Sequence, residues 1–180
     1  MVKKRYIIRT ILISFGVLIA VAVTFVSEQY YRWHICNFRS KDGEAHSIYV
    51  YPGASTDSVM NLLREYYDIS SETDLKLHMR YFILHHPEPG HYRFDAQEGD
   101  RDVIERLKYG RQTPIRLTWN NFVRTREDLA GKITSRLLMD SVTLLRLLED
   151  DAYMEKYGMN KETSRCLFVP NTYEVYWNIR

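Results

Sequence analysis

The pattern of apolar and polar positions starts with an uncharged apolar run over residues 10–26, which ends at Ser27 and Glu28. A helix needs about 20 residues to cross the hydrocarbon core of a bilayer. Residues 6–8 supply the missing length, because Arg9 can extend its charge to the interface. The pattern therefore predicts one membrane-spanning helix within residues 1–28.

The charges that flank this run predict its orientation. The basic residues ahead of it are Lys3, Lys4, Arg5 and Arg9. Basic flanks stay in the cytoplasm, so we expect a cytoplasmic N-terminus, the bulk of the chain outside the cytoplasm, and Tyr30, Tyr31 and Trp33 at the outer interface. A cleaved signal peptide is the alternative. Its apolar region would be shorter, and the A-x-A triplet at residues 20–22 lies inside the run.

Residues 29–45 are polar and mixed, which predicts a short tether. Residues 47–51 are rich in β-branched and aromatic side chains and are stopped by a Pro-Gly pair, so they predict a strand. Ser55 is placed to cap a helix, and Ser71 or Thr73 is placed to cap a second one. The apolar face of the first helix would carry Val59, Leu62, Leu63 and Tyr66.

The second half of the chain alternates between the two kinds of element. We expect a strand at residues 91–94, a helix over residues 100–109 that ends at Gly110, and a strand over residues 113–119. Thr125 and Ser141 are expected to cap two more helices, the second unbroken to residue 157 with Leu148 on its apolar face. The order of elements predicts an α+β fold.

Composition narrows the class of partner and of chemistry. The 180 residues carry a net charge of +2 with basic residues scattered among acids, which argues against nucleic acid. Cys36 and Cys166 have no metal-ligand spacing, and they either pair in an oxidising compartment or stay as separate thiols. His85, His86 and His91 lie where a helix gives way to a strand, and neighbouring side chains point apart. We therefore expect no metal site and no cofactor.

Three segments follow the anchor in a fixed order: IYVYPGASTDSVMNLL, then PGHYRF with VIERLKYGRQTPIRLTW, then LFVPNTY. Together with the anchor they resemble the endolytic peptidoglycan transglycosylases of the YceG-like family, whose signature is Phe-Pro-Asp-Thr-Tyr. The resemblance covers most of the chain. It implies a LysM-like β-α-α-β module at residues 46–111 and the beginning of the catalytic domain at residues 112–180, with the rest of that domain missing. It also implies a single-pass protein of the bacterial inner membrane, with its bulk in the periplasm.

The chemistry of that family needs one carboxyl group, which first protonates the glycosidic oxygen and then draws the 6-hydroxyl of the sugar onto the anomeric carbon. In the family this glutamate stands five residues before the signature proline and is followed by glycine. Here the proline is Pro170, the residue five before it is Arg165, and Cys166 replaces the glycine. A guanidinium does not give up its proton, so it cannot serve as a general acid. Glu162 and Glu174 flank the motif as the remaining carboxyl groups.

Glu174 is the preferred catalytic candidate of the two, because a carboxyl group among Tyr173, Tyr176 and Trp177 could be desolvated enough to hold a proton. The resemblance implies that the substrate cleft is shaped by Pro170, Asn171, Thr172 and Tyr173.

Two functions of different classes follow. The first is a membrane-anchored endolytic lytic transglycosylase that cleaves nascent peptidoglycan strands to 1,6-anhydro-muramyl ends during cell wall biogenesis. The second is a non-catalytic anchored module that binds peptidoglycan or a synthase partner. Both place the chain at the cytoplasmic membrane, and both take peptidoglycan glycan strands as a partner. They differ in whether an acid is present in the cleft.

Overall fold

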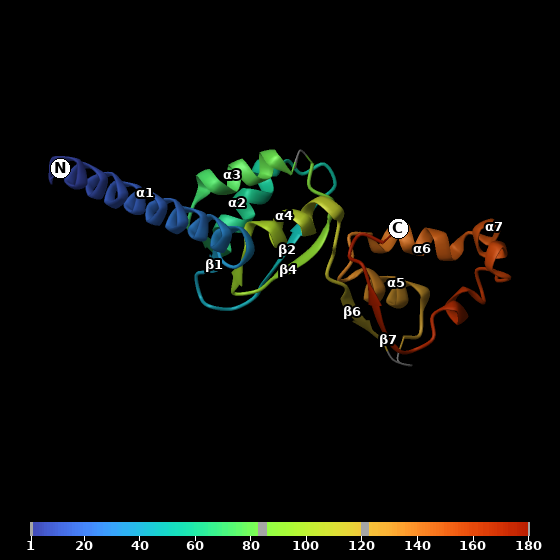
Figure 1. Ribbon diagram of the computed structural model, residues 1–180. Helices are drawn as coiled ribbons and strands as arrows, with labels where there is room; N and C mark the ends of the chain where they lie inside the picture. Colours follow the sequence, from blue (N-terminus) through green and yellow to red (C-terminus); the bar gives the residue numbers. More distant parts are fainter. Residues whose placement is uncertain (1, 83–85, 120–122, 180) are drawn as a thin grey trace.

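The computed structural model describes residues 2–82, 86–119 and 123–179, and its elements form an α+β chain (Figure 1). The helices are α1 (Val2–His34), α2 (Thr56–Tyr66), α3 (Glu72–Tyr81), α4 (Asp100–Tyr109), α5 (Arg126–Thr134), α6 (Ser141–Glu149) and α7 (Asp151–Met154). The strands are β1 (Phe38–Ser40), β2 (His46–Val50), β3 (Tyr67–Ile69), β4 (Gly90–Phe94), β5 (Gln97–Glu98), β6 (Ile115–Thr118) and β7 (Thr172–Val175). The chain also contains two 3₁₀ turns, Glu155–Tyr157 and Ser164–Leu167.

Helix α1 extends away from the rest of the chain (Figure 1). Its segment Thr10–His34 is long and apolar enough to cross a membrane: its most apolar stretch of 18 residues has a mean hydropathy of 2.4, and no residue of that stretch is buried against other parts of the chain. A rise of about 1.5 Å per residue makes such a segment longer than a bilayer core. The predicted apolar helix is therefore present, while its orientation and its membrane stay predictions.

The expected tether at residues 29–45 is wrong, because this stretch is built into the fold. Helix α1 continues to His34, and β1 pairs antiparallel with both β3 and β5. Cys36, Asn37 and Phe38 are all buried. The polar composition of this stretch predicted a tether because strand β1 is stabilised by partners far along the chain, which composition does not reveal. The polar side chain of Asn37 can be buried because its amide group is hydrogen-bonded.

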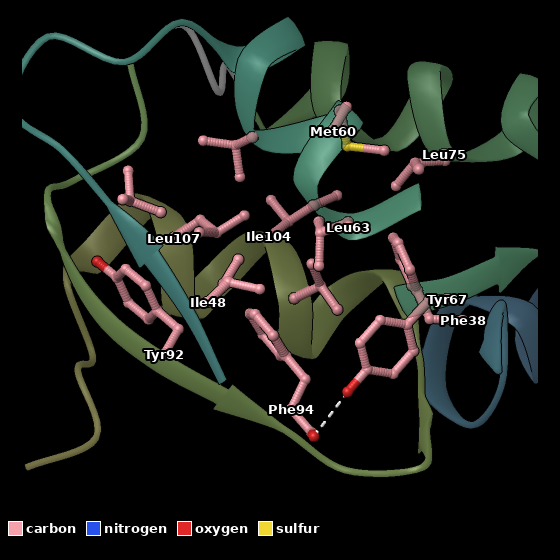
Figure 2. Close-up of a cluster of buried hydrophobic side chains, with 13 residues drawn as sticks. Phe38, Ile48, Met60, Leu63, Tyr67, Leu75, Tyr92, Phe94, Ile104 and Leu107 are labelled. Carbon is pink, nitrogen blue, oxygen red and sulfur yellow. Dashed lines mark hydrogen bonds between the residues drawn. The ribbon is translucent and has the colours of Figure 1, made fainter. Parts of the chain in front are cut away.

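The first hydrophobic cluster lies between helices α2 and α4 and the antiparallel pair β2 and β4 (Figure 2). The hydroxyl of Tyr67 donates to the carbonyl of Phe94 at 2.7 Å inside it. Ser55 and Ser71 cap α2 and α3 as predicted, since each side chain accepts from the backbone N–H three residues on. The predicted face of α2 was partly wrong: the buried side chains are Val59, Met60 and Leu63, while Leu62 is 37% exposed.

The second cluster is formed by β6, β7, α5 and α6. Strand β6 pairs antiparallel with β7, with Ile115 opposite Val175 and Thr118 opposite Thr172. The cluster contains Leu117, Trp119, Leu129, Leu148 and Trp177 among its buried side chains. The two clusters meet where Trp177 contacts Tyr49 and Tyr51 with ring centroids 5.1 and 5.0 Å apart.

Two details of the helices after β6 differ from the prediction. Thr125 caps α5 as expected, but the cap of α6 is Asp140 rather than Ser141. The expected single helix to residue 157 is split at Asp150, whose carboxylate accepts from the backbone N–H groups of Ala152 and Tyr153 and starts α7. An aspartate tends to end one helix and begin another, because its side chain accepts hydrogen bonds from nearby backbone N–H groups in a non-helical conformation.

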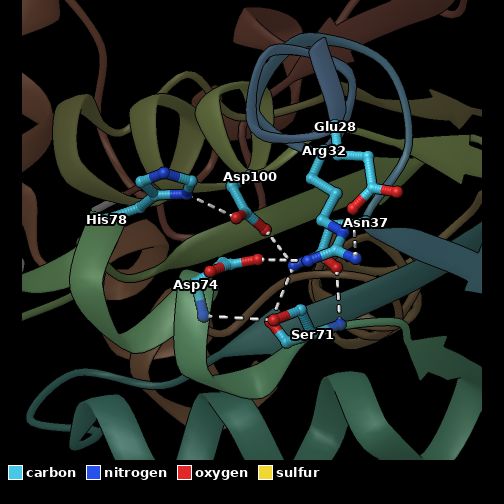
Figure 3. Close-up of polar contacts among 7 residues, drawn as sticks. All are labelled: Glu28, Arg32, Asn37, Ser71, Asp74, His78 and Asp100. Carbon is cyan, nitrogen blue, oxygen red and sulfur yellow. Dashed lines mark hydrogen bonds and ion pairs between the residues drawn. The ribbon is translucent and has the colours of Figure 1, made fainter. Parts of the chain in front are cut away.

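The end of α1 is joined to the first cluster by buried polar contacts (Figure 3). The Asn37 amide donates to the fully buried Asp100 carboxylate at 2.7 Å, and His78 Nδ1 lies 2.6 Å from the other oxygen of Asp100. Burial raises the pKa of the Asp100 carboxyl, against the hydrogen bonds from Asn37 and His78, which lower it. A Cβ added at Gly99 would stand 2.7 Å from the backbone of Trp33, so α4 begins directly against the end of α1.

A second ion pair supports the same junction. Arg32 Nη1 lies 2.6 Å from Asp74 Oδ2, at the start of α3. Burial raises the pKa of Asp74, but the hydrogen bonds from Arg32 and Ser71 outweigh it and hold that pKa below its usual value. The Trp33 ring packs on His78 and Phe82 with centroids 4.4 and 4.9 Å away. Helix α1 and the first cluster therefore form one continuous unit.

Candidate functional site

The segment LFVPNTY runs from the last residue of the 3₁₀ turn Ser164–Leu167 to the second residue of strand β7. A pocket of about 340 Å³ opens beside it. We name this hollow the signature pocket. The residues that line it include Trp119, Leu129, Arg165, Cys166, Phe168 and Pro170. The sequence motif and the position five residues before its proline therefore lie around one hollow.

Trp119 forms the aromatic wall of the signature pocket. Its ring stacks on Tyr173 at a centroid distance of 4.6 Å with 11° between the planes, and it meets the edge of Phe168 at 6.4 Å. Only 9% of Trp119 is exposed. Its indole N–H is buried and has no hydrogen-bond partner among the described residues. The wall is therefore aromatic and largely buried, with one polar N–H that has no partner among the described residues.

Arg165 also lines the signature pocket and is exposed. Its guanidinium donates to the backbone carbonyl of Arg124. None of the ion pairs found among the described residues includes Arg165, whereas Arg116 and Arg126 each have a carboxylate within 4.0 Å. The pocket wall thus carries a positive charge that no carboxylate of the described chain neutralises by direct contact.

A second pocket, of about 320 Å³, shares Arg165 with the first. It is polar, and its charged lining residues are Arg124, Arg126, Glu127, Glu162 and Arg165. The backbone N–H of Glu127, the Thr125 hydroxyl and the charges of Arg126 and Arg165 hold the pKa of Glu127 below its usual value. Glu162, the other carboxylate flanking the motif, is exposed and lines this second pocket rather than the signature pocket.

Glu174 does not lie in the signature pocket. Side chains alternate along β7, so that Tyr173 and Val175 face the second cluster while Glu174 faces solvent. The Glu174 side chain is 64% exposed and lies 3.7 Å from Arg116 on the neighbouring strand. The expected desolvation of Glu174 among aromatic rings is therefore wrong: the strand presents the rings to one side and the carboxylate to the other.

The four residues expected to shape the cleft are divided by the same alternation. Pro170 lines the signature pocket, and Tyr173 supports it by stacking under Trp119 and by donating its hydroxyl to the Val169 carbonyl at 2.8 Å. Thr172 faces the other way, its hydroxyl 2.9 Å from that of Thr118. The Asn171 side chain accepts from the Thr172 N–H at 2.7 Å and stabilises the turn.

The remaining candidate residues are dispersed. Cys36 is buried at the end of α1 and Cys166 is exposed in the signature pocket, and both are free thiols. His91 Nδ1 lies 2.8 Å from the Thr113 carbonyl, while His85 lies outside the described residues. In the part of the chain that the structure describes, no three His, Cys, Asp or Glu side chains are grouped so as to hold a metal ion.

Comparisons with known proteins give little beyond the structure itself. No protein-family model matches the chain, and no curated protein matches it either. A crystal structure of a yceG-like protein from Listeria monocytogenes is similar to it over 74% of this chain and 48% of that one, with 13% sequence identity and a TM-score of 0.42. The chain thus spans about half the length of that solved protein.

Proposed function

We propose that this chain is a membrane-anchored protein of the YceG-like type, and that it binds peptidoglycan glycan strands at the signature pocket without cutting them. One observation carries the proposal: Arg165 occupies the pocket wall at the motif position where the resemblance expects the general acid. None of the described residues that line this pocket carries a carboxylate.

The absence of cutting follows from proton chemistry. The leaving oxygen of a glycosidic bond needs a proton from an acid within about 3 Å. Arginine holds its proton at every physiological pH, so Arg165 cannot supply it. Glu174, the catalytic candidate from the sequence, faces solvent on the side of the β6 and β7 pair opposite α5, whereas Leu129 of α5 lines the pocket. A strand bound in the pocket would be out of its reach.

Binding is supported by the shape and lining of the pocket. Ligand pockets generally span about 300 to 1,000 Å³ and combine an apolar lining with a few polar groups. The apolar faces of pyranose rings pack well on aromatic surfaces, and Trp119 and Phe168 provide such surfaces beside Pro170. The stack of Trp119 on Tyr173 holds this wall in place before any ligand arrives.

The anchor completes the proposal. With a cytoplasmic N-terminus, helix α1 would hold both clusters on the outer side of the inner membrane, where nascent strands are made. The buried junction of Asn37, His78 and Asp100 keeps the first cluster joined to this helix. A LysM-like role for residues 46–111 and a synthase partner stay predictions.

The test is incubation of the full chain, in detergent micelles, with uncross-linked glycan strands. The proposal expects the strands to be retained with immobilised protein and recovered at their original mass. Products with 1,6-anhydro ends, formed by the wild type and lost in Glu174→Gln, would instead establish the transglycosylase hypothesis. Failure to retain strands at all would refute the binding proposal.

A further inference from the structure

Arg165 is the charged residue among the described residues that line the signature pocket. A neutral sugar chain bound there would have no charged group to pair with it. Its guanidinium has five N–H donors, of which one hydrogen bond, to the Arg124 carbonyl, is formed. Arg116 lies 3.7 Å from Glu174 and Arg126 lies 3.9 Å from Glu149, whereas Arg124, which lines the second pocket together with Arg165, has no ion pair among the described residues. Arg165 therefore has no carboxylate in direct contact among the described residues, although its charge helps to lower the pKa of Glu127.

The surroundings of Arg165 favour an anion from outside the chain. The second pocket places Arg124 on the same rim as Arg165, against the carboxylates of Glu127 and Glu162, and Arg126 in that pocket is paired with Glu149. Glu127 already accepts hydrogen bonds from its own N–H and from Thr125. An incoming carboxylate would meet donors that these two glutamates leave free.

Resting on the proposed function, we infer that Arg165 recognises a carboxylate carried by the muramyl sugars of the strand. Every second sugar of a peptidoglycan strand bears a 3-O-lactyl group, which ends in a carboxylate or continues into a stem peptide with carboxylates of its own. A pyranose ring bound in the signature pocket would carry this substituent in the same cavity that Arg165 lines. The planar guanidinium can hold such a carboxylate with two parallel hydrogen bonds.

The recognition gives the pocket selectivity between two similar polymers. A chain of N-acetylglucosamine alone has the same rings and the same acetamido groups but no carboxylate. It would pack on the aromatic wall and gain nothing from Arg165. Muramyl-containing strands would gain a charge-assisted contact, which weakens as salt is added because the site is exposed.

The experiment measures binding of three probes to the full chain in micelles by calorimetry. The probes are an N-acetylglucosamine hexamer, strands stripped of stem peptides, and strands that keep them. Arg165→Gln is expected to bind stripped strands about tenfold more weakly than the wild type, as for the loss of one charge-assisted contact. Arg165→Lys should recover part of the affinity, because it keeps the charge but not the fork. The hexamer should bind both variants and the wild type equally.

Arg116→Gln is the matched control, because it makes the same substitution at an exposed arginine outside the pocket. It should leave all three affinities unchanged. A loss confined to strands with stem peptides would assign the contact to the peptide carboxylates, and a loss with stripped strands would assign it to the lactyl group. Unchanged binding of both strands by Arg165→Gln overturns this inference alone. No binding of any strand by the wild type overturns the proposed function with it.

Discussion

The replacement Asp100→Ala tests whether the buried polar contacts join the anchor helix to the first cluster. Asp100 is fully buried and accepts from the Asn37 amide at 2.7 Å, and His78 Nδ1 lies 2.6 Å away. Alanine removes both acceptor oxygens at once. The Asn37 amide keeps its hydrogen bond to the Ser71 carbonyl at 3.1 Å, so Asn37 loses only part of its hydrogen bonding.

The expected magnitude follows from these contacts. Removing one partner of a buried, hydrogen-bonded charge costs about 3 to 5 kcal/mol. The loss is reduced because the Asp100 carboxylate itself is desolvated, as its raised pKa indicates, and because the His78 side chain is 17% exposed and can reach water. We therefore expect Asp100→Ala to lower the free energy of unfolding by about 2 to 4 kcal/mol. Asp100→Asn keeps the shape and should lose less.

The assay is urea unfolding of the full chain in micelles, followed by far-ultraviolet circular dichroism. Asp102→Ala is the matched control, because Asp102 stands in the same first turn of α4 but is exposed. It should change stability by less than about 0.5 kcal/mol. Equal stability of Asp100→Ala and Asp102→Ala would refute the reasoning, since the buried contacts would then contribute nothing.

Two further predictions concern the turn after β1 and the first cluster. The Ser40 hydroxyl and neighbouring groups hold the pKa of Asp42 below its ordinary 3.8. Asp42→Asn should therefore lose stability at neutral pH, and unfolding at decreasing pH should show the deficit shrinking below about pH 4, because a depressed carboxyl pKa stabilises only while the group is ionised. Leu63→Ala should lower the free energy of unfolding, measured by thermal unfolding, by about 2 to 5 kcal/mol, because Leu63 is fully buried. Leu62→Ala should change that free energy by less than about 1 kcal/mol. Equal losses at these two positions would contradict the placement of α2.

Helix starts could be predicted from the sequence because capping is local. Ser55, Ser71 and Thr125 each accept from a backbone N–H three residues on, a contact that short-range spacing alone specifies. The start of α6 was placed one residue late, since Asp140 and Ser141 are both good caps and only the backbone geometry separates them.

Features that depend on distant partners could not be predicted in this way. Strand β1 is three residues long, and it exists because β3 and β5 pair with it from both sides. The periodicity of α2 predicted Leu62 on the apolar face, whereas packing in the first cluster buries Met60 instead. Local pattern thus specified most helices and the strands β2, β4 and β6, while the exact helix faces and the short strands β1, β3 and β5 depended on tertiary contacts.

The candidate site was predicted in part. The motif directed attention to Pro170 and to position 165, and both line one pocket. Trp119 was missed as a site residue because it reaches the pocket from the position just after β6, far upstream of the motif in the sequence. The outward direction of Glu174 did have a signal: in an alternating strand, aromatic Tyr173 and apolar Val175 pointing inward leave Glu174 on the other face.

Alkylation of the chain's own thiols tests the central claim, that glycan strands occupy the signature pocket, most directly. Cys166 is exposed in that pocket, whereas Cys36 is 3% exposed and serves as an internal control. The rate of modification at each thiol is measured by mass spectrometry, with and without saturating strands of unchanged length. The account predicts that bound, uncut strands slow the modification of Cys166 and leave Cys36 unaffected. Strands that bind the chain while Cys166 reacts at its free rate would contradict it.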